Sequence, residues 1–269
     1  MTTTEEMIKP IKCKSVKFLS QVVTKYNGSK PIVFWDTCAL LDILNFYIIQ
    51  EKDSSSQYDF YQNILQEIKE DRILSVTSQL VYKEFIQHFA TMYKKIAINE
   101  KSLKNVYLEY ADTLPQAQKK GLTKAANQLN IVPVFDKLIR DIWKGTIIIK
   151  EQQTFQDSAH YRVVNKIPPA AVKGEYKDCY IWTTFVSLSN ALKKRYSSHP
   201  EMFFITSNAK DFQGPQNQNV GVQLECDRFG LTLCLTIESL WNQYQAYLHS
   251  SAHNPAPAVT PAVAAMPSV

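Results

Sequence analysis

The sequence has no uninterrupted run of about 20 apolar residues, the length that a membrane-spanning helix needs. Its first residues are polar Thr and Glu, without the contiguous apolar stretch of an export signal. The five cysteines are odd in number and include no Cys-x-x-Cys pair, which argues against a disulfide framework and against a zinc site. These absences predict a soluble, unexported protein of the cytoplasm.

The composition is that of a globular protein with a substantial core. Of the 269 residues 45% are hydrophobic and 20% are charged, which favours one α/β domain with additions over a disordered or fibrous chain. The formal net charge of +5 suits a polyanionic partner, but a solvated lysine surface explains it equally well.

Short apolar runs, typical of buried strands, alternate with amphipathic stretches, typical of helices. Strands are predicted at residues 31–35, 73–77, 202–206 and 231–235, and 146–150 is either a strand or merely extended. Helices are predicted at 15–26, 37–49, 58–69, 78–95, repeatedly over 99–145, and at 174–196, with a loop before 174. A short helix is predicted from Asn208, and a closing helix after the last strand is predicted to end at about 248. This order predicts a mostly parallel central sheet covered by helices, with an inserted helical layer.

Four regions follow from this pattern. Residues 1–30 form an N-terminal helical extension, and residues 31–249 form the main domain, with the helical insertion at about 97–150. Residues 250–269 are rich in Ala and Pro and contain no Lys, Arg, Asp or Glu, so this tail is predicted to be disordered.

Several acidic residues fall where an open α/β sheet presents its functional edge, at the carboxyl ends of strands and the nearby helix starts. Asp36 follows the first predicted strand, and Asn208 and Asp211 follow a later one. Asp178 extends the apolar stripe of its helix, so its carboxylate is expected to face the sheet. Clustered carboxylates repel one another, and a hard divalent cation such as Mg²⁺ or Mn²⁺ would keep them ionised.

Each acid also has a purely structural explanation. Asp36 can cap the helix that follows it, and Glu84 can be a solvated helix residue. The helix dipole favours an acid such as Asp178 in the first turn of a helix, and Asn208 and Asp211 have the spacing of a capping box. These separate explanations leave the joint pattern of acids unexplained.

The joint pattern resembles the PIN-domain ribonucleases. The resemblance lies, in order and setting, in four segments: Val33–Cys38, Gln79–Glu84, Tyr176–Trp182 and Phe204–Phe212. It implies a Rossmann-like α/β/α sandwich and a metal-dependent endoribonuclease that cleaves single-stranded RNA. It also implies that one or two Mg²⁺ or Mn²⁺ ions are bound by Asp36, Glu84, Asp178 and Asp211, with Asn208 as an alternative fourth ligand.

The resemblance further implies residues that contact substrate. Thr37 follows the first acid as in the family, and Thr206 opens the last motif, in which Ser207 is the next residue. Four basic residues before or beside Asp178 lie outside the minimal motif of the family, and their charge predicts that they hold substrate phosphates, although a solvated loop explains them nearly as well: Arg162, Lys166, Lys173 and Lys177. The long interval between Glu84 and Asp178 fits the helical insertion and sets the chain apart from the compact toxin members.

Two other hypotheses compete with the nuclease. A haloacid-dehalogenase phosphatase also has an Asp after its first strand, but it needs a second acid where this chain has Cys38. A catalytically inactive PIN-like module would bind RNA or protein without cutting, although all four acidic positions are filled. An inhibitory or complex partner protein and the oligomeric state are left open.

Overall fold

The computed structural model describes residues 16–26, 30–45, 54–170, 175–196, 200–213 and 220–253, around a six-stranded sheet. From edge to edge its strands are β1 (Val16–Lys17), β4 (Thr146–Ile149), β3 (Leu74–Ser78), β2 (Ile32–Trp35), β5 (Met202–Ile205) and β6 (Leu231–Cys234). Every neighbouring pair runs parallel. The predicted α/β fold with a parallel central sheet is confirmed.

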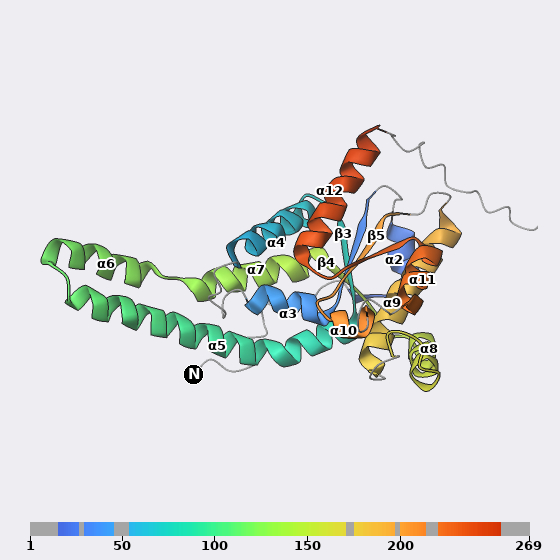
Figure 1. Ribbon diagram of the computed structural model, residues 1–269, viewed down its shortest axis with the longest axis horizontal. Coiled ribbons are helices and arrows are strands. Elements are labelled where there is room, and N and C mark those ends of the chain that lie inside the picture. The colour runs from blue at the N-terminus through green and yellow to red at the C-terminus, as the bar shows by residue number, and fades with distance from the viewer. Residues whose placement is uncertain are drawn as a thin grey trace, which may run out of the picture.

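Helices cover both faces of this sheet (Figure 1). One face carries α4 (Ser54–Lys69), α7 (Ile131–Gly145) and α12 (Ile237–His253), and the other carries α2 (Leu19–Lys25), α9 (Tyr176–Arg195) and α11 (Val220–Phe229). Because both faces are covered, all residues of the central strands β2 and β5 are buried and none needs to be polar. None of the helices in the described residues is long and apolar enough to span a membrane.

The three strands in the middle of the sheet end level with one another. Trp35, the last residue of β2, pairs with Thr77 of β3 on one side and with Ile205 of β5 on the other. The stacked rings of Phe34 and Phe204, with centroids 5.8 Å apart, fix this register from within the core. The residues that follow these strands therefore emerge together at one edge of the sheet.

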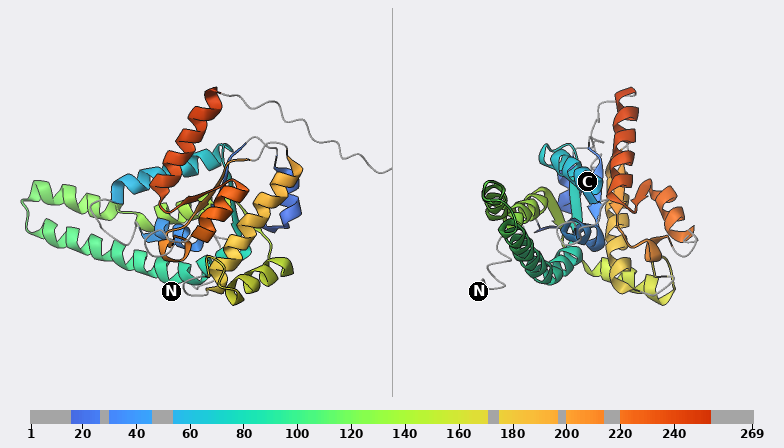
Figure 2. Two further views of the ribbon diagram at one scale, coloured as in Figure 1. Left: turned by 45° about the vertical axis from the view of Figure 1, so that its right-hand side comes forward. Right: turned by 60° about the vertical axis from the view of Figure 1, so that its left-hand side comes forward.

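A helical arm projects from the domain (Figures 1 and 2). It consists of the outer half of α5 (Gln79–Asp112) and of α6 (Gln116–Gln128), which packs back along it. The sequence predicted a break near Lys95 and an insertion over 97–150, but α5 is one continuous helix because it contains neither Gly nor Pro. The insertion also ends earlier than predicted, since Thr146–Ile149 is the sheet strand β4.

The N-terminal segment differs from its prediction as well. Val16 and Lys17 form β1, which pairs with Ile148 and Ile149, so the sheet begins before the predicted domain boundary at residue 31. The helix predicted over 15–26 is shortened to Leu19–Lys25. A two-residue edge strand has too few positions for any apolar pattern, which explains why the sequence did not indicate it.

Two helices were missed. α8 (Gln153–Val164) occupies part of the predicted loop, and it buries only Phe155 and Ala159, so it offers no apolar periodicity to detect. α11 likewise buries little beyond Val222 and Cys226. The closing helix α12 continues to His253, past the predicted start of the tail, and residues 254–269 lie outside the described residues, as do residues 46–49 of the helix predicted after Asp36.

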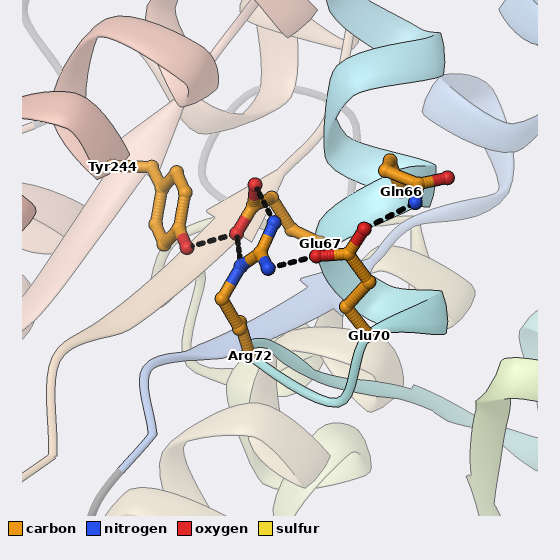
Figure 3. A network of polar contacts seen from close by, with 5 residues as sticks. All are labelled: Gln66, Glu67, Glu70, Arg72 and Tyr244. Carbon is orange, nitrogen blue, oxygen red and sulfur yellow. Dashed lines mark hydrogen bonds and ion pairs between the residues drawn. The ribbon is translucent and has the colours of Figure 1, made fainter.

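At the amino end of the strands, a polar network fastens α12 to α4 and to the turn before β3 (Figure 3). The Arg72 guanidinium forms ion pairs with both Glu67 and Glu70, and the two N–H groups that it points at Glu67 lie 2.5 and 2.7 Å from the carboxylate oxygens. The Tyr244 hydroxyl of α12 donates a hydrogen bond of 2.5 Å to the same carboxylate. Every acidic side chain drawn here therefore has a cationic partner.

Candidate active site at the carboxyl edge of the sheet

Asp36 stands at the centre of the carboxyl edge, directly after β2. Its backbone N–H donates to the Ile205 carbonyl at 3.0 Å, which continues the β2–β5 pairing by one residue. Its side chain is 1% exposed and accepts two short hydrogen bonds, from the Thr37 backbone N–H and from the Thr206 hydroxyl, each at 2.6 Å. The carboxylate is thus held in one orientation by the ends of two strands.

The turn after β5 adds a second layer of polar groups. The backbone N–H of Asn208 donates to the Thr206 hydroxyl oxygen at 3.0 Å, so the residue that orients Asp36 also shapes this turn. The Asn208 side-chain amide donates to Asp211 at 2.7 Å and to Asp178 at 3.2 Å. Asn208 therefore bridges the two aspartates that the sequence placed on different elements, and Asp211 is 4% exposed in α10 (Ala209–Phe212).

Asp178 comes from the first turn of α9, as the sequence predicted. The next three residues, Cys179 to Ile181, are buried against the domain, and this packing turns the start of the helix toward the sheet edge. Asp178 itself is partly buried. The structure thus brings it within hydrogen-bonding reach of Asn208.

Glu84 lies in the second turn of α5, which begins after Ser78, where the Ser78 side chain caps the helix by accepting a hydrogen bond from the Val81 N–H at 3.2 Å. One Glu84 oxygen accepts a hydrogen bond from the Thr37 hydroxyl at 2.7 Å, and the other lies 2.6 Å from the Lys177 ammonium. Thr37 is the residue after Asp36, so a short chain of contacts links Glu84 to the central carboxylate.

The electrostatics of this edge differ from those of an ordinary protein surface. Burial raises the pKa of Asp36 to about 6, and the charge of Glu84 adds to this, while the hydrogen bonds from Thr206 and Thr37 oppose it. Burial, reinforced by the charges of Asp36 and Asp211, raises the pKa of Asp178 to about 8. In the absence of a cation, the ionised forms of these carboxyl groups are disfavoured.

The donor atoms at this edge suit a hard divalent cation, because carboxylate and amide oxygens are the ligands that Mg²⁺ and Mn²⁺ prefer. Within the ranges that the structure describes, however, no three acidic, histidine or cysteine side chains are already arranged so that they could hold a metal ion. The oxygen atoms are instead taken up by the Lys177 ammonium and the Asn208 amide. The chemical type of the ligands fits a metal, and their arrangement is not that of an assembled site.

The other predicted substrate contacts are distributed unevenly. Thr37, Thr206 and Lys177 lie within the cluster, and Ser207 is exposed beside it. Arg162 is placed elsewhere: its guanidinium lies 2.6 Å from Glu225 and donates to the Pro168 carbonyl.

Lys166 and Lys173 complete the set of predicted contacts. Lys166 is exposed at the end of α8, where it has a positive φ of 51°, and Lys173 lies outside the described residues. The structure therefore joins one of the four basic residues, Lys177, to the acids.

One residue of the site was not singled out from the sequence. The Cys38 thiol is partly buried beside Asp36, and burial together with the charges of Asp36 and Asp178 raises its pKa far above the usual range. It is therefore a neutral thiol at neutral pH, and a poor nucleophile. The sequence signal that could have identified Cys38 was its position two residues after Asp36.

An all-parallel sheet between helices, with buried acids gathered at its carboxyl edge, defines a class of α/β proteins whose site lies at the strand ends. A family model described as PIN domain matches residues 33–212, from β2 to α10, and the chain belongs to this family. Its members are in general metal-dependent nucleases, which fits the acidic edge. No curated protein and no solved structure matches the chain.

Proposed function

We propose that the protein is a divalent-metal-dependent endoribonuclease that hydrolyses phosphodiester bonds in single-stranded RNA at the carboxyl edge of the sheet. The observation that carries this proposal is the convergence of Asp36, Asp178 and Asp211 through Thr206 and Asn208, in a family of nucleases. The raised pKa values of Asp36 and Asp178 support it, because a bound cation would offset both the burial and the repulsion between acids that raise them.

In this proposal Asp36, Asp178, Glu84 and either Asp211 or Asn208 hold Mg²⁺ or Mn²⁺. When bound, the cation supplies a Lewis acid for the phosphodiester and lowers the pKa of a coordinated water. The hydrogen bonds from Thr206 and from the Thr37 N–H orient the Asp36 carboxylate, and the Thr37 hydroxyl orients Glu84, so these contacts would set the position of the bound cation.

Lys177 and Ser207 are proposed to contact substrate. The Lys177 side chain is 58% exposed although it pairs with Glu84, so its ammonium lies at the surface of the cluster where a phosphate would approach. The pairing with Glu84 raises the pKa of Lys177 and keeps it cationic. Arg162 is not part of this proposal, because its guanidinium is committed to Glu225 and Pro168.

The test uses the purified full-length chain with linear and circular single-stranded RNA, since only an endonuclease opens a circle. Cleavage is expected with Mg²⁺ or Mn²⁺ and is expected to stop on addition of EDTA. The Asp36→Asn variant should lose at least about 100-fold in rate, because the best-held carboxylate is lost. The matched control is Asp227→Asn on the exposed face of α11, which changes the charge equally and should cleave at the wild-type rate.

Metal binding is measured separately, as the rise in melting temperature on adding Mn²⁺. Intact RNA and DNA with both metals, together with retained RNA binding, would refute the nuclease and favour the non-cleaving binding module. Cleavage by Asp36→Asn at the wild-type rate would refute the assignment of the site while leaving the activity standing.

A further inference from the structure

The outer helix of the arm, α6, contributes almost nothing to the hydrophobic core. Ala126 is its single buried residue, and most of its other side chains are exposed. Because Ala126 alone is buried in α6, most of the surface of this helix presents side chains to solvent.

The charge of this region has a single sign. Residues 113–135 contain Lys119, Lys120 and Lys124 and no Asp, Glu or Arg. Lys119 pairs with Asp112 at 2.7 Å, but that carboxylate is 71% exposed, so the pair is weak. No ion pair among the described residues involves Lys120 or Lys124.

These lysines share one surface with other hydrogen-bonding side chains. A shallow hollow along α6 is lined by Lys119, Lys120, Lys124, Thr123, Asn127 and Gln128. Protein–protein interfaces are depleted of Lys and enriched in aromatic residues, which this surface lacks. Lys, Thr, Asn and Gln are instead the residue types that contact phosphates and sugars of nucleic acids.

We propose that this α6 surface is a second nucleic-acid contact, which binds the phosphate backbone of a single strand at a distance from the catalytic edge. The inference rests on the proposed nuclease function, because it treats the strand held by the arm as the substrate. It assigns to the arm a role in affinity, and none in the cleavage step.

The geometry sets the length of strand that can use this contact. From Glu84 to Asp112, α5 is about 40 Å long at about 1.5 Å per residue, and α6 runs back along it. The lysines therefore lie on the order of 30–40 Å from Glu84, which at about 3.4 Å per nucleotide corresponds to roughly 10 nucleotides of a stacked strand, and to fewer of an extended one. Strands of about 3 nucleotides cannot reach both places even when they are extended, and strands of about 24 nucleotides can.

The test compares two double variants with the same change in net charge. Lys120→Glu with Lys124→Glu alters the α6 surface, and Lys193→Glu with Lys194→Glu alters exposed lysines at the end of α9. Binding of labelled RNA is measured by fluorescence anisotropy in EDTA, so that no strand is cut, and the salt concentration is varied. Circular dichroism and melting temperature establish that both variants fold.

The α6 variant is expected to bind RNA of about 24 nucleotides roughly 10-fold more weakly, with a salt slope smaller by about 1, and to show a much smaller loss with strands of about 3 nucleotides. The α9 variant should match the wild type on both. Two results would support contacts to the phosphate backbone: wild-type affinity in the charge-preserving variant Lys120→Arg with Lys124→Arg, and a similar loss of affinity for single-stranded DNA in the variant with two Glu substitutions. A loss confined to RNA would overturn the backbone assignment.

Equal affinity of the α6 variant and the wild type at low salt would overturn the proposal, as would equal weakening in the α9 variant. The outcome for the catalytic site is separate. If the wild type binds through α6 but cleaves nothing with either metal, the nuclease function fails and the α6 contact stands. If Asp36→Asn loses cleavage but keeps its affinity for the long strand, both stand.

Discussion

The acids around Arg72 at the amino end of the sheet and the acids around Asp36 at its carboxyl edge differ in how their charges are balanced. At the amino end, Glu67 is paired with Arg72, whose hydrogen bonds lower the pKa of the carboxyl group against the effect of burial. At the carboxyl end, burial and neighbouring acids raise the pKa values of Asp36 and Asp178. The Lys177 ammonium reaches Glu84 there. Glu67 thus gains a cationic partner that stabilises the fold, whereas the ionised carboxylates of Asp36 and Asp178 weaken the metal-free fold.

The largest expected effect is on cleavage. Asp178→Asn removes a proposed metal ligand and should lower the rate of RNA hydrolysis by at least about 100-fold. Glu67→Gln removes a carboxylate from the amino end and should leave the rate within about 2-fold, if assayed well below the melting temperature. Equal losses in both variants would mean that the two ends do not differ in function.

The same contrast predicts opposite effects of pH on the metal-free fold. An Asp whose pKa is raised in the folded state keeps its proton while the unfolded chain loses it. Asp36 and Asp178 therefore reduce stability as pH rises from about 4, and the reduction levels off above about pH 8. Glu67, with its lowered pKa, contributes stability above about pH 4.5 that is lost as pH falls.

Denaturant unfolding at several pH values measures this. In EDTA, Asp178→Asn should be more stable than the wild type by about 5 kcal/mol at pH 8, at about 1.4 kcal/mol per pKa unit, and nearly equal to it at pH 4. Added Mn²⁺ should narrow the gap by stabilising the wild type alone. A wild type that is more stable than Asp178→Asn at pH 8 in EDTA would contradict the unfavourable burial of this carboxylate.

A smaller effect is expected from the hydroxyl that fastens α12. Tyr244 is fully buried, and its hydroxyl donates to Glu67 at 2.5 Å. Tyr244→Phe should lower the free energy of unfolding by about 1–2 kcal/mol, with no change in cleavage rate or Mn²⁺ affinity. Tyr247→Phe on the same helix, which is only partly buried, is the matched control for removal of a hydroxyl. A change in Mn²⁺ affinity would show that the two ends are coupled.

The smallest effect concerns the cation at the carboxyl end. Lys177→Met frees a Glu84 oxygen from the ammonium, so Mn²⁺ should bind a few-fold more tightly while RNA binds more weakly. Isothermal titration with Mn²⁺ and anisotropy with RNA measure the two quantities. The neighbouring exposed residue provides the control, since Tyr176→Phe should change neither by more than about 2-fold. Weaker Mn²⁺ binding would mean that Lys177 positions Glu84 for the metal.

The sequence predicts best the elements that have a repeating apolar pattern and the residues that directly follow buried strands. β2 and β5 are apolar along their whole length because both faces are buried, and Asp36 and Thr206 follow them at the edge that a parallel sheet uses for function. Asp178 was found because it continues an apolar stripe. β1 and α8 were missed because neither presents a repeating buried face.

The sequence also could not predict which polar side chains pair with one another. Arg162 was a candidate for phosphate contact by charge alone, and the fold instead pairs it with Glu225, more than sixty positions away in the chain. The Asn208 amide, which reaches Asp178 and Asp211, was predicted only as an alternative ligand. Such pairings depend on how elements pack across the sheet, and they leave no local signal.

The continuity of α5 has a mechanical consequence. The helix is anchored in the domain by buried side chains as far as Ile96, and beyond this point Ala111 is its next buried residue. A force on the far end of the arm will therefore bend α5 smoothly beyond Ile96, because α5 contains no Gly or Pro that could act as a hinge. Glu84 lies in the part of α5 that is anchored in the domain. Bending of the arm therefore leaves the geometry around Asp36 unchanged.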